Sequence, residues 1–158
     1  NMPLYKIPFA AAEFIKQYKK SVPLLQFNPG VEDLLTELSK DGTPYAVLSS
    51  NSTKNISEFF RLKNVPVNDI FCSSNIFGKD KVLRKFLRAK NLKPSEILYV
   101  GDEARDIIAC RKVGIRIAWV SWGYDVLKTI EDCPPDFYIH SPADLRELII
   151  ALQLPLPE

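Results

Sequence analysis

The chain has 158 residues, of which 46% are hydrophobic and 25% charged, as is typical of one soluble globular domain. Its net charge of +2 is too small to indicate a nucleic-acid surface, and no apolar run is long enough to cross a membrane. We therefore expect neither nucleic acid nor membrane as a partner. The three cysteines form no CxxC pair, which favours reduced thiols in a cytoplasmic protein over a zinc site.

The first 27 residues stand apart from the rest of the chain. Residues 3–20 carry apolar side chains at helical spacing, and Pro8 permits a helix only from about its own position onward. We interpret residues 1–27 as part of a helical cap. Asn1 precedes Met2, whereas a natural chain starts with Met, so we expect a processed product, a tagged chain or a fragment.

Residues 28–158 alternate between helical and strand patterns. Asn28-Pro29-Gly30 predicts a helix start, with Asn28 as the cap and Pro29 at the first helical position. Further helices are predicted over 51–61, 80–90 and 103–113 and after 141–142, and short buried strands over 45–49, 70–72, 97–100, 115–120 and 137–139. This alternation predicts an α/β fold with a parallel sheet and right-handed crossovers.

Two aspartates follow the most apolar of these strands. Asp102 comes directly after Gly101 at the carboxyl end of strand 97–100, where open α/β sheets bind ligands. Asp106 lies one helical turn further on and can point the same way. Paired carboxylates suit Mg²⁺, which prefers oxygen ligands. The alternative is that Asp102 caps the helix and Asp106 is a solvated charge.

Polar groups also stand at two other element ends. Ser49, Ser50 and Asn51 end a buried strand and precede a helix, which favours anion binding, although helix capping by Ser50 or Asn51 is the alternative. Lys79 stands at a helix start, an unfavourable place for a cation, and this suggests a nearby anion or carboxylate. A surface lysine is the alternative. The basic face of the helix over 80–90 is interpreted as solvated.

In chain order, the hydroxyl, the lysine and the paired aspartates resemble motifs of the haloacid dehalogenase-like hydrolase superfamily, in its phosphoglycolate-phosphatase-like branch. Ser50-Asn51 looks like the second motif, Lys79 like the third, and Gly101-Asp102-x-x-x-Asp106 like the fourth. The resemblance covers about residues 28–145. It implies a Rossmann-like three-layer α/β core and a Mg²⁺-dependent phosphatase of a small phosphorylated metabolite.

The resemblance also implies a role for each motif residue. Ser50 would bind a phosphate oxygen and Asn51 would orient it, while Lys79 would neutralise charge on the transferred phosphoryl group. Asp102 would ligate Mg²⁺, and Asp106 would hold Lys79 or a metal-bound water, so both aspartates belong to the metal site. Ser49 is the neighbouring candidate for the second motif. Lys81 is the rival for the third motif, but Lys79 has a glycine before it.

The chain departs from the family in one large respect. The first motif, an apolar strand ending in Asp-x-Asp-x-Thr, supplies the nucleophile, and no Asp-x-Asp occurs here. In the family that strand lies between those carrying the second and fourth motifs. We therefore expect residues 28–158 to form a core without its first strand. We expect the parent protein to carry the nucleophile upstream, and this chain alone to be inactive.

Other classes of protein fit the pattern less well. A non-catalytic fragment or binding module remains the main alternative, because the nucleophile is absent. In a response-regulator receiver the acidic pair comes first rather than last, and a dinucleotide-binding domain would have a GxGxxG after a strand. His140, the single histidine, is assigned a structural or solvated role, and Trp122 either borders the pocket or packs in the core.

Overall fold

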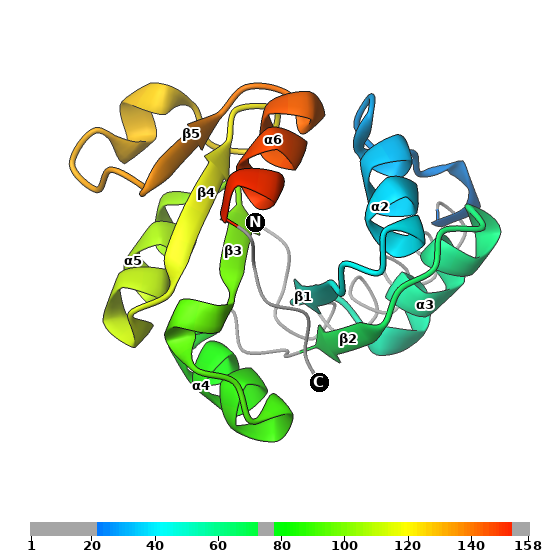
Figure 1. The fold of residues 1–158 in the computed structure, drawn as a ribbon, viewed down its shortest axis with the longest axis horizontal. Coiled ribbons are helices and arrows are strands. Elements are labelled where there is room, and N and C mark those ends of the chain that lie inside the picture. The colour runs from blue at the N-terminus through cyan, green and yellow to red at the C-terminus, as the bar shows by residue number, and fades with distance from the viewer. Residues whose placement is uncertain (1–21, 73–77, 153–158) are drawn as a thin grey trace, which may run out of the picture.

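The computed structural model describes residues 22–72 and 78–152, in which helices surround short parallel strands (Figure 1). Most of the proposed cap lies outside these residues, so the domain boundary at residue 27 stays a prediction. Among the described helices, none is long and apolar enough to span a bilayer. The helices are α2 (Val31–Lys40), α3 (Thr53–Leu62), α4 (Lys79–Lys90), α5 (Ala104–Val113) and α6 (Pro142–Leu152), with 3₁₀ turns at Val22–Leu24, Pro94–Glu96 and Leu127–Ile130.

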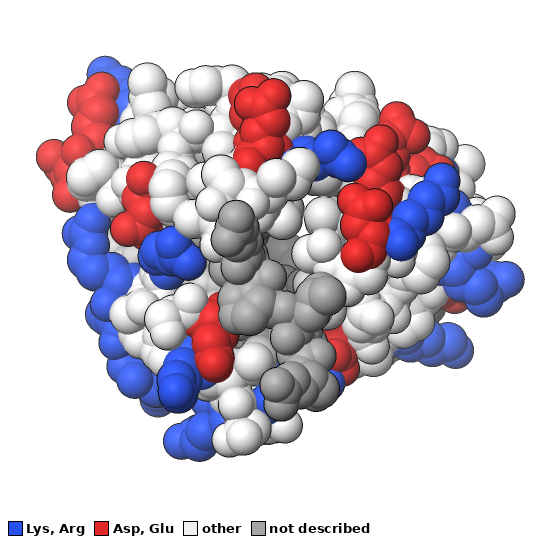
Figure 2. Space-filling view, in the orientation of Figure 1, with Lys and Arg blue, Asp and Glu red and all other residues white. Residues whose placement is uncertain are grey.

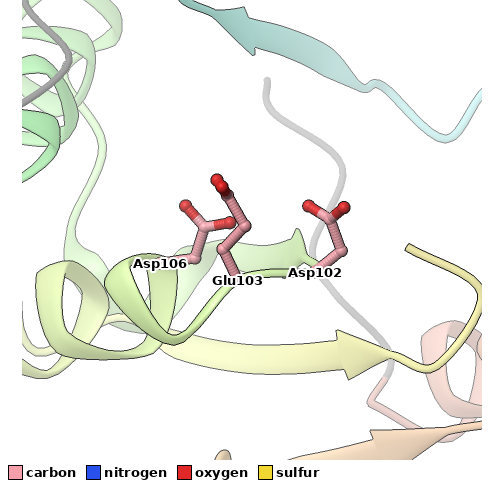
Figure 3. A group of neighbouring side chains, drawn as sticks. All are labelled: Asp102, Glu103 and Asp106. Atoms are coloured by element: carbon pink, nitrogen blue, oxygen red, sulfur yellow. The ribbon is translucent and has the colours of Figure 1, made fainter. Parts of the chain in front are cut away.

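The strands form two parallel ladders rather than one. β1 (Ala46–Ser49) pairs with β2 (Asp69–Cys72), while β3 (Leu98–Gly101), β4 (Arg116–Val120) and β5 (Phe137–Ile139) form the second ladder in that order. Figures 1 and 3 both show β1 on the side of β3 opposite to β4. The predicted α/β class with parallel strands is confirmed. Within the described residues, β1 and β3 are each the end strand of their ladder on the facing side.

Two clusters of apolar side chains hold the elements together. The first joins α4, α5 and β4 around Leu83, Ile107 and Trp119, and Leu48 of β1 packs against it. The second joins α2 to α6 and the three-stranded ladder; its fully buried members are Leu34, Leu38, Ala118, Val120, Ile139 and Leu145. Helix α2 leads into β1, and it packs here against α6 and the three-stranded ladder. The second cluster therefore connects the two ladders.

The strand over 97–100 is less buried than its composition predicts. Val100 has an exposed fraction of 41%, whereas Val120 in the adjacent strand β4 has 6%. The prediction of a fully buried strand is therefore wrong for Val100. The physical reason is that β3 ends its ladder, so one side of the strand has no neighbouring strand among the described residues.

Helix starts differ from the predicted ones. Gly30, with φ of 80°, takes the cap position of α2, so the prediction of Asn28 as cap and Pro29 as first helical residue is wrong. The left-handed φ suits glycine, and the Asn28 amide instead donates a hydrogen bond of 3.4 Å to the Trp122 carbonyl oxygen. Helix α3 is capped by Ser52, whose Oγ accepts from the Asn55 N–H at 3.2 Å.

The basic face of α4 is solvated, as predicted. Its four cations are exposed, and Figure 2 shows Lys and Arg gathered along the side of the molecule where α4 and α5 lie. One of the four, Arg84, donates to the Lys112 carbonyl oxygen at 2.5 Å. These cations, Lys81, Arg84, Lys85 and Arg88, therefore line the outer side of α4, while its apolar residues face the core.

Candidate active site

Three carboxylates gather where β3 runs into α5. One oxygen each from Asp102, Glu103 and Asp106 can be chosen so that all lie within 4.8 Å of one another. Figure 3 shows the three side chains pointing to the same side, towards β1. The structure therefore brings together the two predicted metal-site residues and adds Glu103, which the motif did not single out. Three neighbouring carboxylates on two half-buried residues and one buried residue fit a hard cation such as Mg²⁺.

Gly101 allows this tight arrangement. A Cβ at position 101 would lie 2.8 Å from Oδ2 of Asp106 and 2.7 Å from the ring of Tyr99. Any larger residue would push the carboxylate and the ring apart. The helix start adds to the placement, because the Asp106 N–H donates to the Glu103 carbonyl oxygen at 2.9 Å.

Lys79 is the cation that these carboxylates hold. Its ammonium forms an ion pair with Asp106 and lies 3.7 Å from a carboxylate oxygen of Glu103. The prediction of an anion or carboxylate near a lysine at a helix start is confirmed, and the partners are carboxylates. Lys81, the rival residue, is exposed on the outer side of α4. The geometry therefore favours Lys79 as the cation of the site.

Burial controls the electrostatics around Asp106, whose exposed fraction is 2%. Desolvation raises the pKa of the Asp106 carboxyl above its ordinary value, and the Lys79 ammonium offsets part of this rise. Burial also raises the pKa of Tyr99, with the charge of Asp106 as a further cause. Tyr99 therefore stays protonated, and its hydroxyl donates to Oδ1 of Asp106 at 3.4 Å. Asp106 thus receives donors from both α4 and β3.

The carboxyl end of β1 carries the polar loop of the predicted second motif. The Ser49 hydroxyl accepts from the Asn51 N–H at 3.0 Å, whereas Ser50 is exposed. The Asn51 side-chain oxygen accepts from the Ser52 N–H at 2.7 Å and from the Asn55 amide at 3.0 Å. These contacts order the loop at the start of α3. They leave the choice between Ser49 and Ser50 as phosphate ligand a prediction, with Ser50 the more exposed residue.

A model of the haloacid dehalogenase-like hydrolases matches residues 2–120 of the sequence. The chain belongs to this family. Two phosphoglycolate phosphatases support the predicted branch: that of Synechococcus elongatus is 31% identical over 139 residues, covering 87% of this chain and 66% of the relative. That of Pectobacterium atrosepticum is 31% identical over 127 residues, covering 75% of this chain and 53% of the relative.

Solved structures of haloacid dehalogenase-like proteins share the fold. A hydrolase of this family from Streptococcus pneumoniae aligns with a TM-score of 0.81 at 23% identity, covering 94% of this chain and 72% of its own. A predicted phosphoglycolate phosphatase from Haemophilus somnus aligns with a TM-score of 0.81 at 19% identity, covering 94% of this chain and 68% of its own. The Rossmann-like core inferred from the motifs is confirmed. The chain spans about half to two thirds of the two curated relatives described above.

The remaining sequence candidates have simpler surroundings. His140 is exposed at the end of β5, and its backbone N–H donates to Asp144 at 3.2 Å. Trp122 is half-buried and packs against the cluster around α2 and α6, which favours the packing alternative over the pocket. The sequence reasoning gave no role to Tyr99, or to Tyr124, whose backbone N–H donates to Asp102 Oδ2 at 2.7 Å. A contact 22 residues away in sequence leaves no local signal of its own.

Proposed function

We propose that this chain carries the metal- and phosphate-binding residues of a Mg²⁺-dependent phosphatase that acts on a small phosphorylated metabolite. The observation that carries the proposal is the ion pair of Lys79 with Asp106 beside the carboxylates of Asp102 and Glu103. Phosphoryl transfer depends mostly on positioning and on neutralising charge, and these residues supply both. The named activity of the relatives makes phosphoglycolate the first substrate to try.

Each residue has a distinct part in the proposed site. Asp102 and Asp106 hold Mg²⁺, and Glu103 offers a third carboxylate. When bound, the ion would neutralise negative charge on the phosphate oxygens. Lys79 neutralises charge on the transferred phosphoryl group, and Asp106 keeps its ammonium in place. Asp106 can both pair with Lys79 and take part in the metal site, because its two oxygens can contact different partners.

The loop after β1 supplies the phosphate contacts. Ser50 donates its hydroxyl to a phosphate oxygen, and Asn51 orients that oxygen through the loop it orders. The exposure of the Ser50 residue supports this assignment. Ser49 is the second choice because it is half-buried at the end of β1, and its oxygen is tied to the loop by the Asn51 N–H. Neutral donors of this kind complement Lys79 in stabilising an oxyanion.

We propose that the nucleophile comes from a strand upstream of this chain, added between β1 and β3 in a longer parent protein. Two observations support this proposal: both strands end their ladders on the facing side, and Val100 is exposed in the middle of β3. A parallel strand buried on both faces would not leave such a residue in water. Without that strand, we expect no turnover by the chain alone.

A second candidate function is anion or partner binding without catalysis. The absence of any Asp-x-Asp from the sequence favours it. The parent gene and an aryl phosphate assay separate the two candidates. The phosphatase proposal predicts an Asp-x-Asp strand upstream of residue 1 and Mg²⁺-dependent hydrolysis by the parent protein. A parent without that strand, or with it and yet inactive towards aryl phosphate and phosphoglycolate, would support the binding module instead.

A further inference from the structure

The loop that follows β4 forms hydrogen bonds to the turn that carries Asp102. The Tyr124 N–H donates to Oδ2 of Asp102 at 2.7 Å, and the Asp125 N–H donates to the Asp102 carbonyl oxygen at 3.1 Å. The indole N–H of Trp119 donates to the same carbonyl oxygen at 3.2 Å. Both the side chain and the backbone of Asp102 are therefore held from β4 and the loop behind it. A carboxylate with one oxygen fixed in this way cannot rotate freely about its Cβ–Cγ bond.

The side chain of Asp125 adds a hydrogen bond on the helix side of this turn. Its Oδ2 accepts from the N–H of Ala104, the first residue of α5, at 2.7 Å. The first N–H groups of a helix have no partner within the helix, and a negative charge is favourable there. Glu103 occupies the cap position of α5 but makes no capping hydrogen bond with its side chain. Asp125 therefore acts as the external cap and connects the loop to residues on both sides of Glu103.

Gly123 allows the close approach that these hydrogen bonds require. A Cβ at position 123 would overlap the side-chain atoms of Asp102. The loop therefore contacts Asp102 by its backbone, at a position where any side chain would displace either the loop or the carboxylate. Two features of this short loop meet Asp102 itself, the missing Cβ of Gly123 and the two backbone donors, while the Asp125 carboxylate binds the N–H of Ala104 two residues further on.

We propose that Asp125 is a positioning residue, which orients Asp102 for the Mg²⁺ ion through the hydrogen bond to Ala104. This inference rests on the proposed metal role of Asp102. Residues that orient a metal ligand are worth about 10- to 100-fold in metal affinity in other proteins. We expect an effect of that size here, because loss of the Ala104 hydrogen bond frees both the loop and the helix start next to Asp102.

The test compares Asp125→Ala with Asp125→Asn in the full chain. Both substitutions remove the negative charge, but only asparagine keeps an oxygen that can accept from the Ala104 N–H. Asp132→Ala, in an exposed turn, is the matched control for loss of a surface carboxylate. Mg²⁺ affinity is measured by following the backbone amides of a ¹⁵N-labelled chain during titration with MgCl₂, well below the unfolding temperature. Amide exchange at Ala104 is recorded on the same samples.

We expect Asp125→Ala to weaken Mg²⁺ binding by about 10- to 100-fold and to speed exchange at Ala104, while Asp125→Asn and Asp132→Ala stay close to the unsubstituted chain. Equal weakening by both Asp125 substitutions would overturn the proposal, because charge alone would explain it. Unchanged affinity in Asp125→Ala would overturn it as well, and would leave the metal site standing. No saturable Mg²⁺ binding by the unsubstituted chain would overturn the proposed metal site together with this role of Asp125.

Discussion

Removal of the Lys79 charge should destabilise the fold by leaving a buried carboxylate without its cation. Lys79→Met keeps the apolar stem of the side chain and deletes the ammonium. Asp106 is 2% exposed and Lys79 26% exposed. After the substitution, the Tyr99 hydroxyl at 3.4 Å is the side-chain donor that the structure records for Asp106 within its described part. A single long hydrogen bond cannot compensate for desolvation of a charged group.

The magnitude follows from these exposures. Removing one partner of a fully buried ion pair costs about 3–5 kcal/mol. Since a quarter of the Lys79 side chain is in water, we expect about 2–3 kcal/mol at pH 7 without Mg²⁺. The penalty of Lys79→Met also depends on pH. Because burial raises the pKa of Asp106 and Lys79 partly lowers it, loss of Lys79 raises that pKa further. The variant then takes up a proton more readily, so the penalty shrinks as the pH falls.

Urea unfolding of a double-mutant cycle measures this coupling. The cycle consists of the unsubstituted chain, Lys79→Met, Asp106→Asn and the double variant. Asp106→Asn removes the charge that Lys79 compensates, so the double variant should be more stable than the sum of the single effects by about 1–3 kcal/mol. Additive effects within about 0.5 kcal/mol, or a Lys79→Met penalty that grows as the pH falls, would refute the reasoning.

The remaining predictions concern Gly101, Val100 and Cys110. Gly101→Ala should cost about 1–3 kcal/mol by crowding the Asp106 carboxylate, as measured by urea unfolding, and a neutral result would contradict the close approach. Val100→Thr should lower the free energy of unfolding by less than about 0.5 kcal/mol in this chain, where Val100 is 41% exposed. In the parent protein the loss should be larger, because the proposed additional strand would cover Val100. The matched Val120→Thr, at 6% exposure, should cost about 1–3 kcal/mol in both. Burial raises the pKa of Cys110 to about 12, so iodoacetamide at pH 8 should label it only after denaturation; rapid native labelling would contradict this burial. Since the folded chain holds that proton more tightly, the stability linked to it should fall as the pH rises from about 9 through 12.

The sequence predicted the parts of the site that depend on local order. The position of Asp102 at a strand end follows from an apolar run that stops at Gly101. The unfavourable place of Lys79 in its helix dipole predicted a nearby anion or carboxylate, and Asp106 is such a carboxylate. Such inferences succeed because a few neighbouring residues determine where a strand ends, where a helix starts and how charges are spaced.

The sequence failed where distant segments decide the outcome. Asn28 does not cap α2: Gly30 takes the cap position, and the Asn28 amide donates to the Trp122 carbonyl oxygen 94 residues away. Val100 is exposed because β3 ends its ladder, which a single apolar run cannot reveal. The contacts of Tyr124 and Asp125 with the turn at Asp102 likewise arise from the fold alone. The cytoplasmic location and the absence of nucleic-acid partners stay predictions.

The most direct test of the account is phosphate release from phosphoglycolate by the parent protein, measured with Mg²⁺ and after chelation of the metal. The account predicts release that requires Mg²⁺ and that falls by orders of magnitude in Asp102→Asn, with Asp132→Ala as the unaffected control. Release that persists after chelation, or that Asp102→Asn leaves unchanged, would contradict the assignment of the carboxylates at the end of β3 to a metal-dependent phosphatase site.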